Sequence, residues 1–336
     1  MMLLLLFSLL HLTSLVNVFS IDDLYNFPFS IEKPLILLIK TSTMDVLLKR
    51  YKALGQTFNP SETQIKKSLR VNTLKISEAK LVKRLEKKGV KLEKIKYLKN
   101  GYYYESEFSL GSTPEYLQGY YYLQEAASQL PVSVLNPVPG DIVLDMAAAP
   151  GSKTTQISQM MNNEGVVLAL DIDKRRLLSL VSNLERLSAK NVVIYRLNAR
   201  KADKLGIKFD KILLDAPCSG NFCVEKEFFS KRTVKDFEMK AETQKRLLET
   251  AVNCLKEGGT LVYSTCSLEP EEDELVIDWL LNKYPYLKLE EINIDVGLQG
   301  LTKIFNNSVN EEIKKTKKLW PHLSGTEGFF IAKIRK

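Results

Sequence analysis

The second half of the chain alternates short apolar runs with longer segments of helical periodicity. The apolar runs expected to form strands cover residues 142–145, 166–170, 192–195, 211–214 and 260–264. Helices are expected near 154–161, 174–187, 236–256 and 271–282, and a closing strand over 328–332. Continuous apolar strands separated by helices are typical of a parallel sheet that is covered on both faces. The sequence therefore predicts an α/β fold for this half.

The segment before it has a mixed character. Strands are expected over 69–73 and 102–108, and a helix over 76–88. The turn-forming sequence Asn-Pro-Val-Pro-Gly at 136–140 indicates the start of a second domain. We therefore expect a smaller α+β domain over 44–135 and the α/β domain over 136–336.

The first 43 residues fit neither domain. Residues 1–10 are strongly apolar, but no basic segment precedes them and no small-residue cleavage site follows. Met44 begins an ordinary amphipathic helix. We expect Met44 to be the true first residue, 1–43 to be a start-site artefact and the protein to be cytoplasmic. The alternative is a membrane anchor.

Composition excludes several kinds of chemistry. The chain has only two histidines, which argues against a Ser-His-Asp triad or a multi-histidine metal site, and no metal is expected. Its four cysteines lack the paired C-x2-C spacing of a zinc ribbon, and free thiols are the expectation for a cytosolic protein. Cys223 and Cys254 are interpreted as small buried hydrophobic residues.

The other two cysteines each follow an apolar run. Cys218 ends the sequence Asp-Ala-Pro-Cys that starts at Asp215, and Cys266 lies in Ser-Thr-Cys-Ser after the run 260–264. Ligands of open parallel sheets bind beyond the carboxyl ends of the strands, so both sulfurs could face one pocket.

A turn of small residues links the first strand of this domain to its first helix. Such a turn lets the backbone approach a ligand closely, and the helix that follows directs free N–H groups at it. Asp171, at the end of the next strand, is placed to bind ribose hydroxyls, although it could instead cap a helix, a role that suits Asp173 better. The glycine spacing suits neither a dinucleotide nor ATP, whereas S-adenosylmethionine would fit. The turn residues are Ala147, Ala148, Ala149, Pro150, Gly151, Ser152 and Lys153.

A basic and tyrosine-rich stretch lies in the first domain. With 48 Lys and Arg against 40 Asp and Glu, the net charge of +8 favours a polyanionic partner. Lysines interleaved with aromatic residues are expected where phosphates and unstacked bases are held, and a solvated helix face beside an edge strand is the alternative. The stretch comprises Lys80, Lys83, Arg84, Lys87, Lys88, Lys91, Lys94, Lys96 and Lys99, followed by tyrosines at 102–104 and 120–122.

Three motifs, in order, resemble those of the Sun-type family of RNA cytosine-C5 methyltransferases. They are the Ala-Ala-Ala-Pro-Gly-Ser-Lys-Thr turn at 147–154, Asp-Ala-Pro-Cys-Ser-Gly at 215–220, and Tyr-Ser-Thr-Cys-Ser at 263–267 with Pro-Glu-Glu at 270–272. Further similarity at 70–75, 124–125 and 325–332 extends the resemblance over nearly everything from Met44 onward. The chain looks most like the archaeal tRNA members.

The resemblance implies a Rossmann-like class I methyltransferase domain with a smaller N-terminal α+β RNA-binding domain, and S-adenosylmethionine as cofactor. By resemblance, Cys266 is the nucleophile that adds to cytosine C6, and Cys218 assists release of the product. Asp215 would hydrogen-bond the cytosine edge near N3 and lie beside the cofactor. Lys153 would support the same polar cluster and help to lower the pKa of the thiol.

One cofactor position departs from the family. Where the family usually has Asp, this chain has Asn198, whose amide can still hydrogen-bond an adenine. The expected partner is RNA, with tRNA favoured as the substrate, and no DNA or membrane partner is expected. The protein is expected to be a monomer. The same chemistry on ribosomal RNA stays open as an alternative, and a catalytically silent RNA-binding scaffold is a second one.

Overall fold

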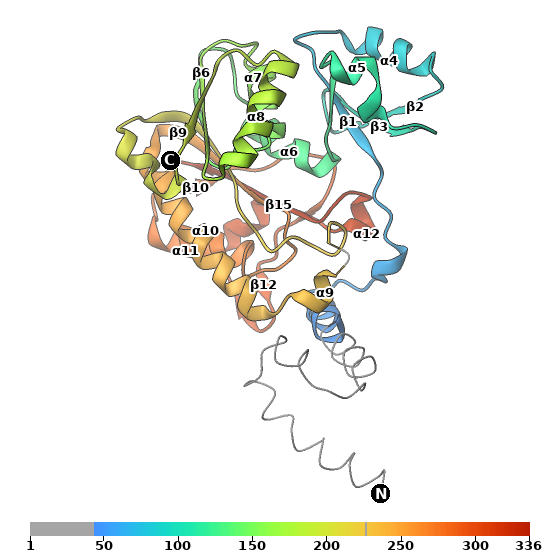
Figure 1. The fold of residues 1–336 in the computed structure, drawn as a ribbon. Helices are drawn as coiled ribbons and strands as arrows, with labels where there is room; N and C mark the ends of the chain where they lie inside the picture. The colour runs from blue at the N-terminus through green and yellow to red at the C-terminus, as the bar shows by residue number, and fades with distance from the viewer. Residues whose placement is uncertain (1–43, 226) are drawn as a thin grey trace, which may run out of the picture.

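A computed structural model describes residues 44–225 and 227–336, so the expectation about residues 1–43 lies outside the described residues. The described chain forms a nine-stranded sheet, a four-stranded sheet and a two-stranded hairpin, with helices around them. The four-stranded sheet comes first in the sequence and lies at the upper right of Figure 1. The predicted α/β fold with a smaller α+β unit is confirmed. Within the described ranges, no helix is both long and apolar enough to cross a membrane.

The larger sheet has five parallel strands at its centre and one edge. They are β5 (Ile142–Asp145), β6 (Val166–Asp171), β7 (Val192–Arg196), β8 (Phe209–Asp215) and β9 (Leu255–Thr265). The order is β9-β8-β5-β6-β7, so the chain runs outward from β5 to β7 and then returns to the other side of β5. Ligands of such sheets bind where the strand order reverses, beyond the carboxyl ends of β5 and β8.

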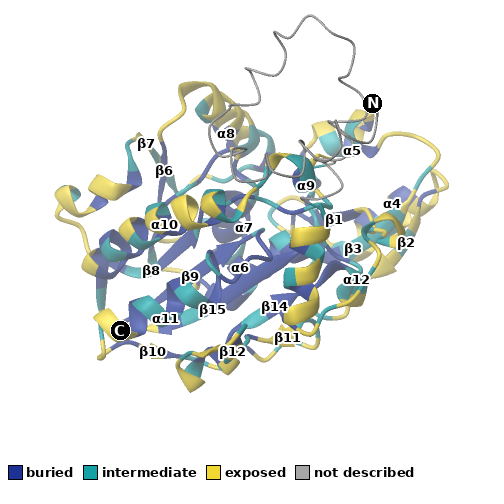
Figure 2. Cartoon of the chain, turned by 90° about the horizontal axis from the view of Figure 1, so that it is seen from below, coloured by how far each residue is buried: buried dark blue, intermediate teal, exposed yellow. Residues whose placement is uncertain are grey.

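Antiparallel strands extend this sheet beyond β9. β15 (Phe329–Arg335), the expected closing strand, pairs with β9 from Phe330 opposite Thr265 to Arg335 opposite Thr260. It is followed in the sheet by β14 (Lys317–Leu319) and β11 (Leu298–Gln299), and β10 (Lys288–Leu289) pairs with β15. β9 is therefore an interior strand, and Figure 2 shows its neighbourhood as the buried centre of the molecule.

Helices cover both faces of this sheet, as predicted. One apolar core joins the strands to α10 (Val234–Cys254) and α11 (Glu274–Lys283), and a second joins their opposite face to α6 (Ala126–Leu135) and α7 (Ser152–Met160). α8 (Lys174–Leu187) packs beside α7 over β6 and β7. Shorter elements are α5 (Pro114–Leu117), α9 (Phe228–Lys231), α12 (Pro321–Ser324), the hairpin strands β12 (Lys303–Ile304) and β13 (Asn307–Ser308), and the 3-10 turns η2 (Pro60–Glu62), η3 (Leu110–Ser112), η4 (Ala199–Leu205) and η5 (Glu311–Lys315).

The smaller sheet is antiparallel, in the order β2-β3-β1-β4. β1 (Ser68–Val71), α4 (Glu78–Glu86) and β3 (Gly101–Glu105) match the expected elements with shifted ends. β2 (Lys91–Lys94) and β4 (Tyr121–Leu123) were not predicted. β2 is an edge strand in which only Leu92 is half-buried, so its sequence is indistinguishable from a charged linker.

The start of α11 differs from the prediction. The helix was expected from residue 271 but begins at Glu274, after Asp273 with φ −112° and ψ −97°. Acidic residues are favourable in the first turn of a helix, which explains the prediction. Glu272 and Asp273 are instead fully buried and turned toward the end of β9, so their tertiary contacts replace the expected helical turn.

The two units are held together by buried polar contacts. Arg70 of β1, 2% exposed, donates to Gln124, Gln159 and Thr155, and burial lowers its pKa to about 9. Asn72 Nδ2 donates at 2.8 Å to the carbonyl oxygens of both Gly119 and Leu187. The first unit is therefore docked rigidly against α7 and the end of α8.

Gly119 gives a test of this docking. Its φ is +71°, and a Cβ atom there would lie 1.8 Å from the carbonyl oxygen of Arg186. Gly206 has a similar φ of +66° but open space around it. We expect Gly119→Ala to lower the free energy of unfolding by about 1–3 kcal/mol more than Gly206→Ala, because only the first adds a clash to the backbone strain. Urea unfolding of both variants measures the difference, and equal losses would contradict the docking.

Candidate active site

The structure brings two cysteine sulfurs together. Cys218 follows β8 and Cys266 follows β9, and these strands pair in parallel with Asp215 opposite Ser264. The two Sγ atoms lie 2.9 Å apart, and both residues are partly exposed. The two sulfurs, which the sequence predicted could face one pocket, are therefore adjacent, and a catalytic role for them stays a prediction.

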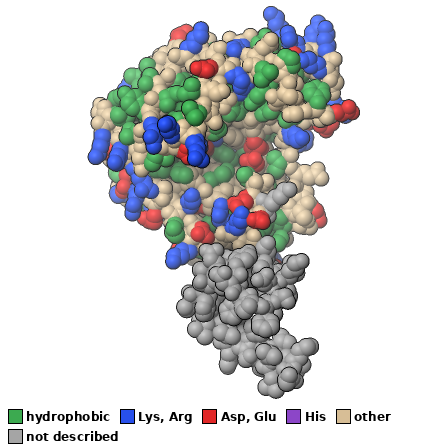
Figure 3. Space-filling view, in the orientation of Figure 1, with side chains coloured by type: hydrophobic (Ala, Val, Ile, Leu, Met, Phe, Trp, Pro, Cys, Tyr) green, Lys and Arg blue, Asp and Glu red, His purple; other side chains and the backbone are tan. Residues whose placement is uncertain are grey.

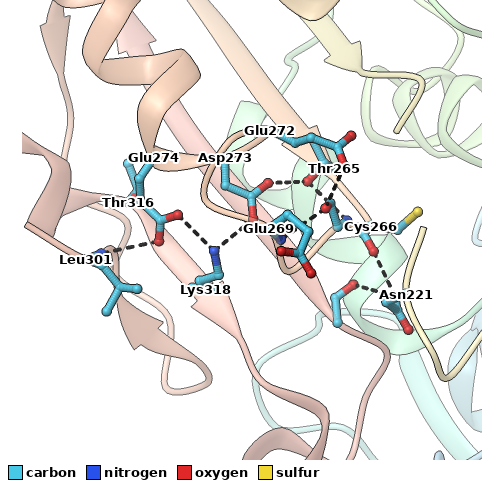
Figure 4. Close-up of polar contacts among 12 residues, drawn as sticks. Asn221, Thr265, Cys266, Glu269, Glu272, Asp273, Glu274, Leu301, Thr316 and Lys318 are labelled. Carbon is cyan, nitrogen blue, oxygen red and sulfur yellow. Dashed lines mark hydrogen bonds and ion pairs between the residues drawn. The ribbon is translucent and has the colours of Figure 1, made fainter. Parts of the chain in front are cut away.

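The Cys266 loop is tied to the loop after β8, which carries Cys218, and to the residue before β15. The side chain of Asn221 donates from Nδ2 to the carbonyl oxygen of Cys266 at 2.7 Å and to that of Gly328 at 3.2 Å (Figure 4). Asn221 is fully buried, so these bonds are shielded from water. The backbone on either side of the sulfur pair is therefore fixed.

A polar cluster lies beside the thiols. Lys153 Nζ is 2.7 Å from Asp215 Oδ2 and 3.0 Å from Ser128 Oγ, and Ser264 Oγ donates to Asp215 Oδ1 at 2.7 Å. Burial by itself lowers the pKa of Lys153, but the attraction of Asp215 outweighs it and the pKa is raised. Lys153 thus carries a positive charge next to the sulfur pair.

The turn of small residues follows β5 and leads into α7, and its last residue, Lys153, belongs to this cluster. Gly151 has φ +107°, and a Cβ atom there would lie 2.9 Å from Leu180 Cδ1, so only glycine fits. The Ala149–Pro150 peptide bond is cis. Asp145 at the end of β5 accepts from Ala147 N and Thr154 Oγ1, and burial raises its pKa to about 6.

Asp171 closes the other side of the turn. Its carboxylate accepts from Asp173 N at 2.9 Å and Ala149 N at 3.3 Å and pairs with Arg176. Asp173 caps α8, as expected, by accepting from the backbone of Arg175 and Arg176. Asp171 is thus not the helix cap and lies beside the turn.

Asn198 is further along the same edge. Its Oδ1 accepts from Arg200 N at 3.1 Å and caps η4. The amide of Asn198 was expected to hydrogen-bond an adenine. Its oxygen is already engaged as the cap of η4.

The residues around the turn fit S-adenosylmethionine. No side chain caps α7, so the N–H groups of its first turn have no side-chain acceptor among the described residues. Ala147 and Pro150 of the turn are accessible, whereas the Asp171 side chain beside them is 3% exposed. In the described ranges no cluster of His, Cys, Asp and Glu could hold a metal ion.

The sequence did not identify several residues at the site. Ser128, in the first turn of α6, bonds Lys153, and the carboxylate of Glu125 accepts from the backbone of Glu327 at 3.2 Å. Burial raises the pKa of Glu327 to about 7. Glu125 and Glu327 lie in the quoted motifs at 124–125 and 325–332, whereas nothing in the local sequence marks Ser128.

The lysines and the arginine of the basic stretch are exposed, whereas the tyrosines that follow it are partly or fully buried. Lysine and arginine side chains gather over the α4 side of the smaller unit (Figure 3). The rings of 102–104 and 120–122 are half-buried or buried, with Lys94 over Tyr102 and Arg84 over Tyr120. Five exposed cations of the stretch make no ion pair with another described residue: Lys80, Lys83, Lys87, Lys96 and Lys99. Positive charge is therefore the accessible feature of this face.

Two family models match the chain. Residues 132–335 match the model described as 16S rRNA methyltransferase RsmB/F, and residues 40–126 match the N-terminal domain of 16S rRNA methyltransferase RsmF. The solved structure of a methyltransferase homolog protein from Pyrococcus horikoshii superimposes with a TM-score of 0.76 at 45% identity, covering 82% of this chain and 88% of that one.

Curated relatives act on different RNAs. A 25S rRNA (cytosine-C(5))-methyltransferase of Schizosaccharomyces pombe is 38% identical over 83% of this chain and 47% of its own length. A tRNA (cytosine(72)-C(5))-methyltransferase of Pyrococcus horikoshii is 41% identical over 68% of this chain and 55% of its own length. The chain thus spans about half the length of these relatives.

The sulfur pair predicts a measurable coupling. The hydrogen bond with Cys266, then burial and the charge of Cys266, raises the pKa of Cys218 well above that of a free thiol. Cys266→Ala removes the first cause, so the pH at which iodoacetamide alkylates Cys218 should move down. Peptide mass spectrometry across a pH series measures it, with Cys254→Ala as the control. An unchanged Cys218 profile in Cys266→Ala would contradict the coupling.

Proposed function

The chain belongs to the RsmB/F family of RNA cytosine-C5 methyltransferases, and from this membership we propose that it methylates C5 of a cytosine in tRNA through a covalent cysteine adduct. The observation that carries the proposal is the pair of sulfurs 2.9 Å apart at the carboxyl ends of β8 and β9. A site for simple RNA binding would not need two adjacent thiols.

The two thiols suit the chemistry of this ring. Cytosine C5 is a poor nucleophile, but a thiolate that adds to C6 converts the ring into an enamine whose C5 is nucleophilic. S-adenosylmethionine, the family's cofactor, supplies an electrophilic methyl group. A base then takes the C5 proton, which passes to water. The electron pair of the broken C5–H bond reforms the C5–C6 double bond, and the C6–S bond breaks with the sulfur leaving as a thiolate.

We assign the nucleophile to Cys266 and assistance in release to Cys218. Cys266 lies in the Thr-Cys motif and Cys218 in the Pro-Cys motif, the positions to which the family resemblance gives these two roles. Asp215 would hydrogen-bond the cytosine edge near N3. The ammonium group of Lys153, 2.7 Å from Asp215, offsets the negative charge that develops on the ring.

The cofactor is proposed to bind at the turn 147–153. Backbone N–H groups at the start of α7 are the groups offered there. Asp171, whose carboxylate now bonds Ala149, Asp173 and Arg176, would exchange one of these contacts for the ribose hydroxyls. Asn198 is a weaker candidate, since its oxygen already caps η4. We expect its amide N–H to make the remaining contact.

Residues 44–135 are proposed to bind the RNA around the target base. Their exposed lysines would contact phosphates, and the base must leave any stack to reach the thiols. The Pyrococcus relative supports tRNA as the substrate, whereas the Schizosaccharomyces relative favours ribosomal RNA as the second candidate. A cytoplasmic location belongs to the same proposal.

The two cysteine variants should behave differently. Cys266→Ala should abolish turnover while leaving cofactor affinity unchanged. Cys218→Ala should trap the RNA adduct, which denaturing electrophoresis shows as a slow, protease-sensitive band. Appearance of the adduct in Cys266→Ala instead would exchange the two roles.

The substrate class is tested by transfer of labelled methyl from S-adenosylmethionine to bulk tRNA and to ribosomal RNA. Bisulfite sequencing of the product locates the modified cytosine. We expect label in tRNA. Label only in ribosomal RNA would retain the chemistry and overturn the substrate, and no label in either would favour the RNA-binding scaffold.

A further inference from the structure

One buried carboxylate connects the loops that carry the two cysteines. Glu272 Oε2 accepts from the backbone N–H of Ser219 at 3.0 Å, and Oε1 accepts from the hydroxyl groups of Ser219 and Ser267, the latter at 3.0 Å. Ser219 is the residue after Cys218, and Ser267 is the residue after Cys266. Glu272 thus bonds to the neighbour of each sulfur.

Glu272 is itself held on its remaining sides. Gln244 of α10 donates to Oε2 at 2.8 Å, and the hydroxyl of Tyr263 donates to the Glu272 carbonyl oxygen at 2.5 Å. The residue is 0% exposed, and its carboxylate receives four donors. A group saturated in this way cannot contact a substrate, so its effect on the site has to act through the loops.

The next residue fixes the other side of Cys266. Thr265 Oγ1 donates to Asp273 Oδ1 at 2.5 Å, and the buried Lys318 Nζ lies 2.9 Å from Asp273 Oδ2 (Figure 4). Asp273 therefore holds the residue before Cys266, while Glu272 holds the residue after it. Of the two carboxylates, only Glu272 also bonds the Cys218 loop, adding to the direct links from Asn221 to the Cys266 carbonyl oxygen and from Ser219 Oγ to Ser267 Oγ.

We propose that Glu272 is a positioning residue that sets the separation of the Cys218 and Cys266 sulfurs. For its consequence in turnover this inference rests on the proposed function, whereas its geometric part concerns the two thiols alone. Addition and release need both sulfurs at the same base. A misplacement on the order of 1 Å can cost about 100-fold in rate.

Glu269 provides a matched control. It is also a glutamate with 0% exposure, three residues from Glu272, but its carboxylate contacts Tyr51 and Arg50 rather than either cysteine loop. Glu269→Gln and Glu272→Gln each replace a buried carboxylate with an amide. Only Glu272→Gln also weakens hydrogen bonds to both cysteine loops. A merely structural role of the buried acids predicts similar effects for both.

The first readout needs neither RNA nor cofactor. Dibromobimane, which becomes fluorescent on linking two close thiols, is applied to the full chain carrying Cys223→Ala and Cys254→Ala. An amide at 272 cannot accept all four donors, so the loops lose part of their link and we expect bridging at least about 10-fold slower. Glu269→Gln should bridge at the parent rate. Ser267→Ala removes the Glu272 bond on the Cys266 side together with the contacts of the same hydroxyl to Ser219 Oγ and Glu269 N, and it leaves the Glu272 bonds to Ser219 in place. It should be intermediate and serves if Glu272→Gln does not melt cooperatively.

The second readout is the split of kinetic constants. We expect Glu272→Gln to lower kcat about 100-fold while KM for RNA and for S-adenosylmethionine changes less than about 3-fold. Bridging at the parent rate in both Glu272→Gln and Ser267→Ala, or equal slowing in Glu269→Gln, would overturn the inference. If the parent protein transfers no methyl yet Glu272→Gln slows bridging, the proposed function fails and the positioning role stands.

Discussion

The parallel pairing of β8 with β9 is the constraint on which the rest of the site depends. Asp215 pairs with Ser264 at the last step of the ladder, so the two loops leave the sheet side by side. Because β9 is interior, held by β8 on one side and β15 on the other, the points at which the two loops leave the sheet are fixed. The register therefore brings the two cysteines near each other, and the contacts of the loops set their separation. The lysine, the carboxylate and the small-residue turn are arranged around the same edge.

Charge burial at the end of β9 gives the site its rigidity. Glu269, Glu272, Asp273, Glu274 and Lys318 are all 0% exposed. Burying so many charges costs free energy that their attraction need not fully return, so such a network is weak evidence for stability. Its members instead fix directions, because each carboxylate has donors that a shifted loop would leave unpaired. A reactive pair of thiols benefits from that kind of rigidity.

The larger sheet and the two cysteines could be predicted from sequence patterns of a few residues, whereas contacts between residues far apart in the sequence could not. The apolar runs, the cysteines after them and the turn before α7 are each readable within a few residues. Ser128 reaches Lys153 across 25 residues, and Glu272 reaches Ser219 across 53, and no local pattern reports either contact. The start of α11 was misplaced for the same reason, since buried contacts of Glu272 and Asp273 override a favourable helical turn. β2 was missed because an exposed edge strand has no apolar alternation.

The measurement that tests the account most directly uses a tRNA substrate carrying tritium at C5 of its cytosines. We predict that each methyl group transferred from S-adenosylmethionine releases one C5 hydrogen to water. Tritium release should therefore match methyl incorporation one to one in the parent protein and vanish in Cys266→Ala. Methyl incorporation without tritium release would place the reaction at another atom and contradict the account.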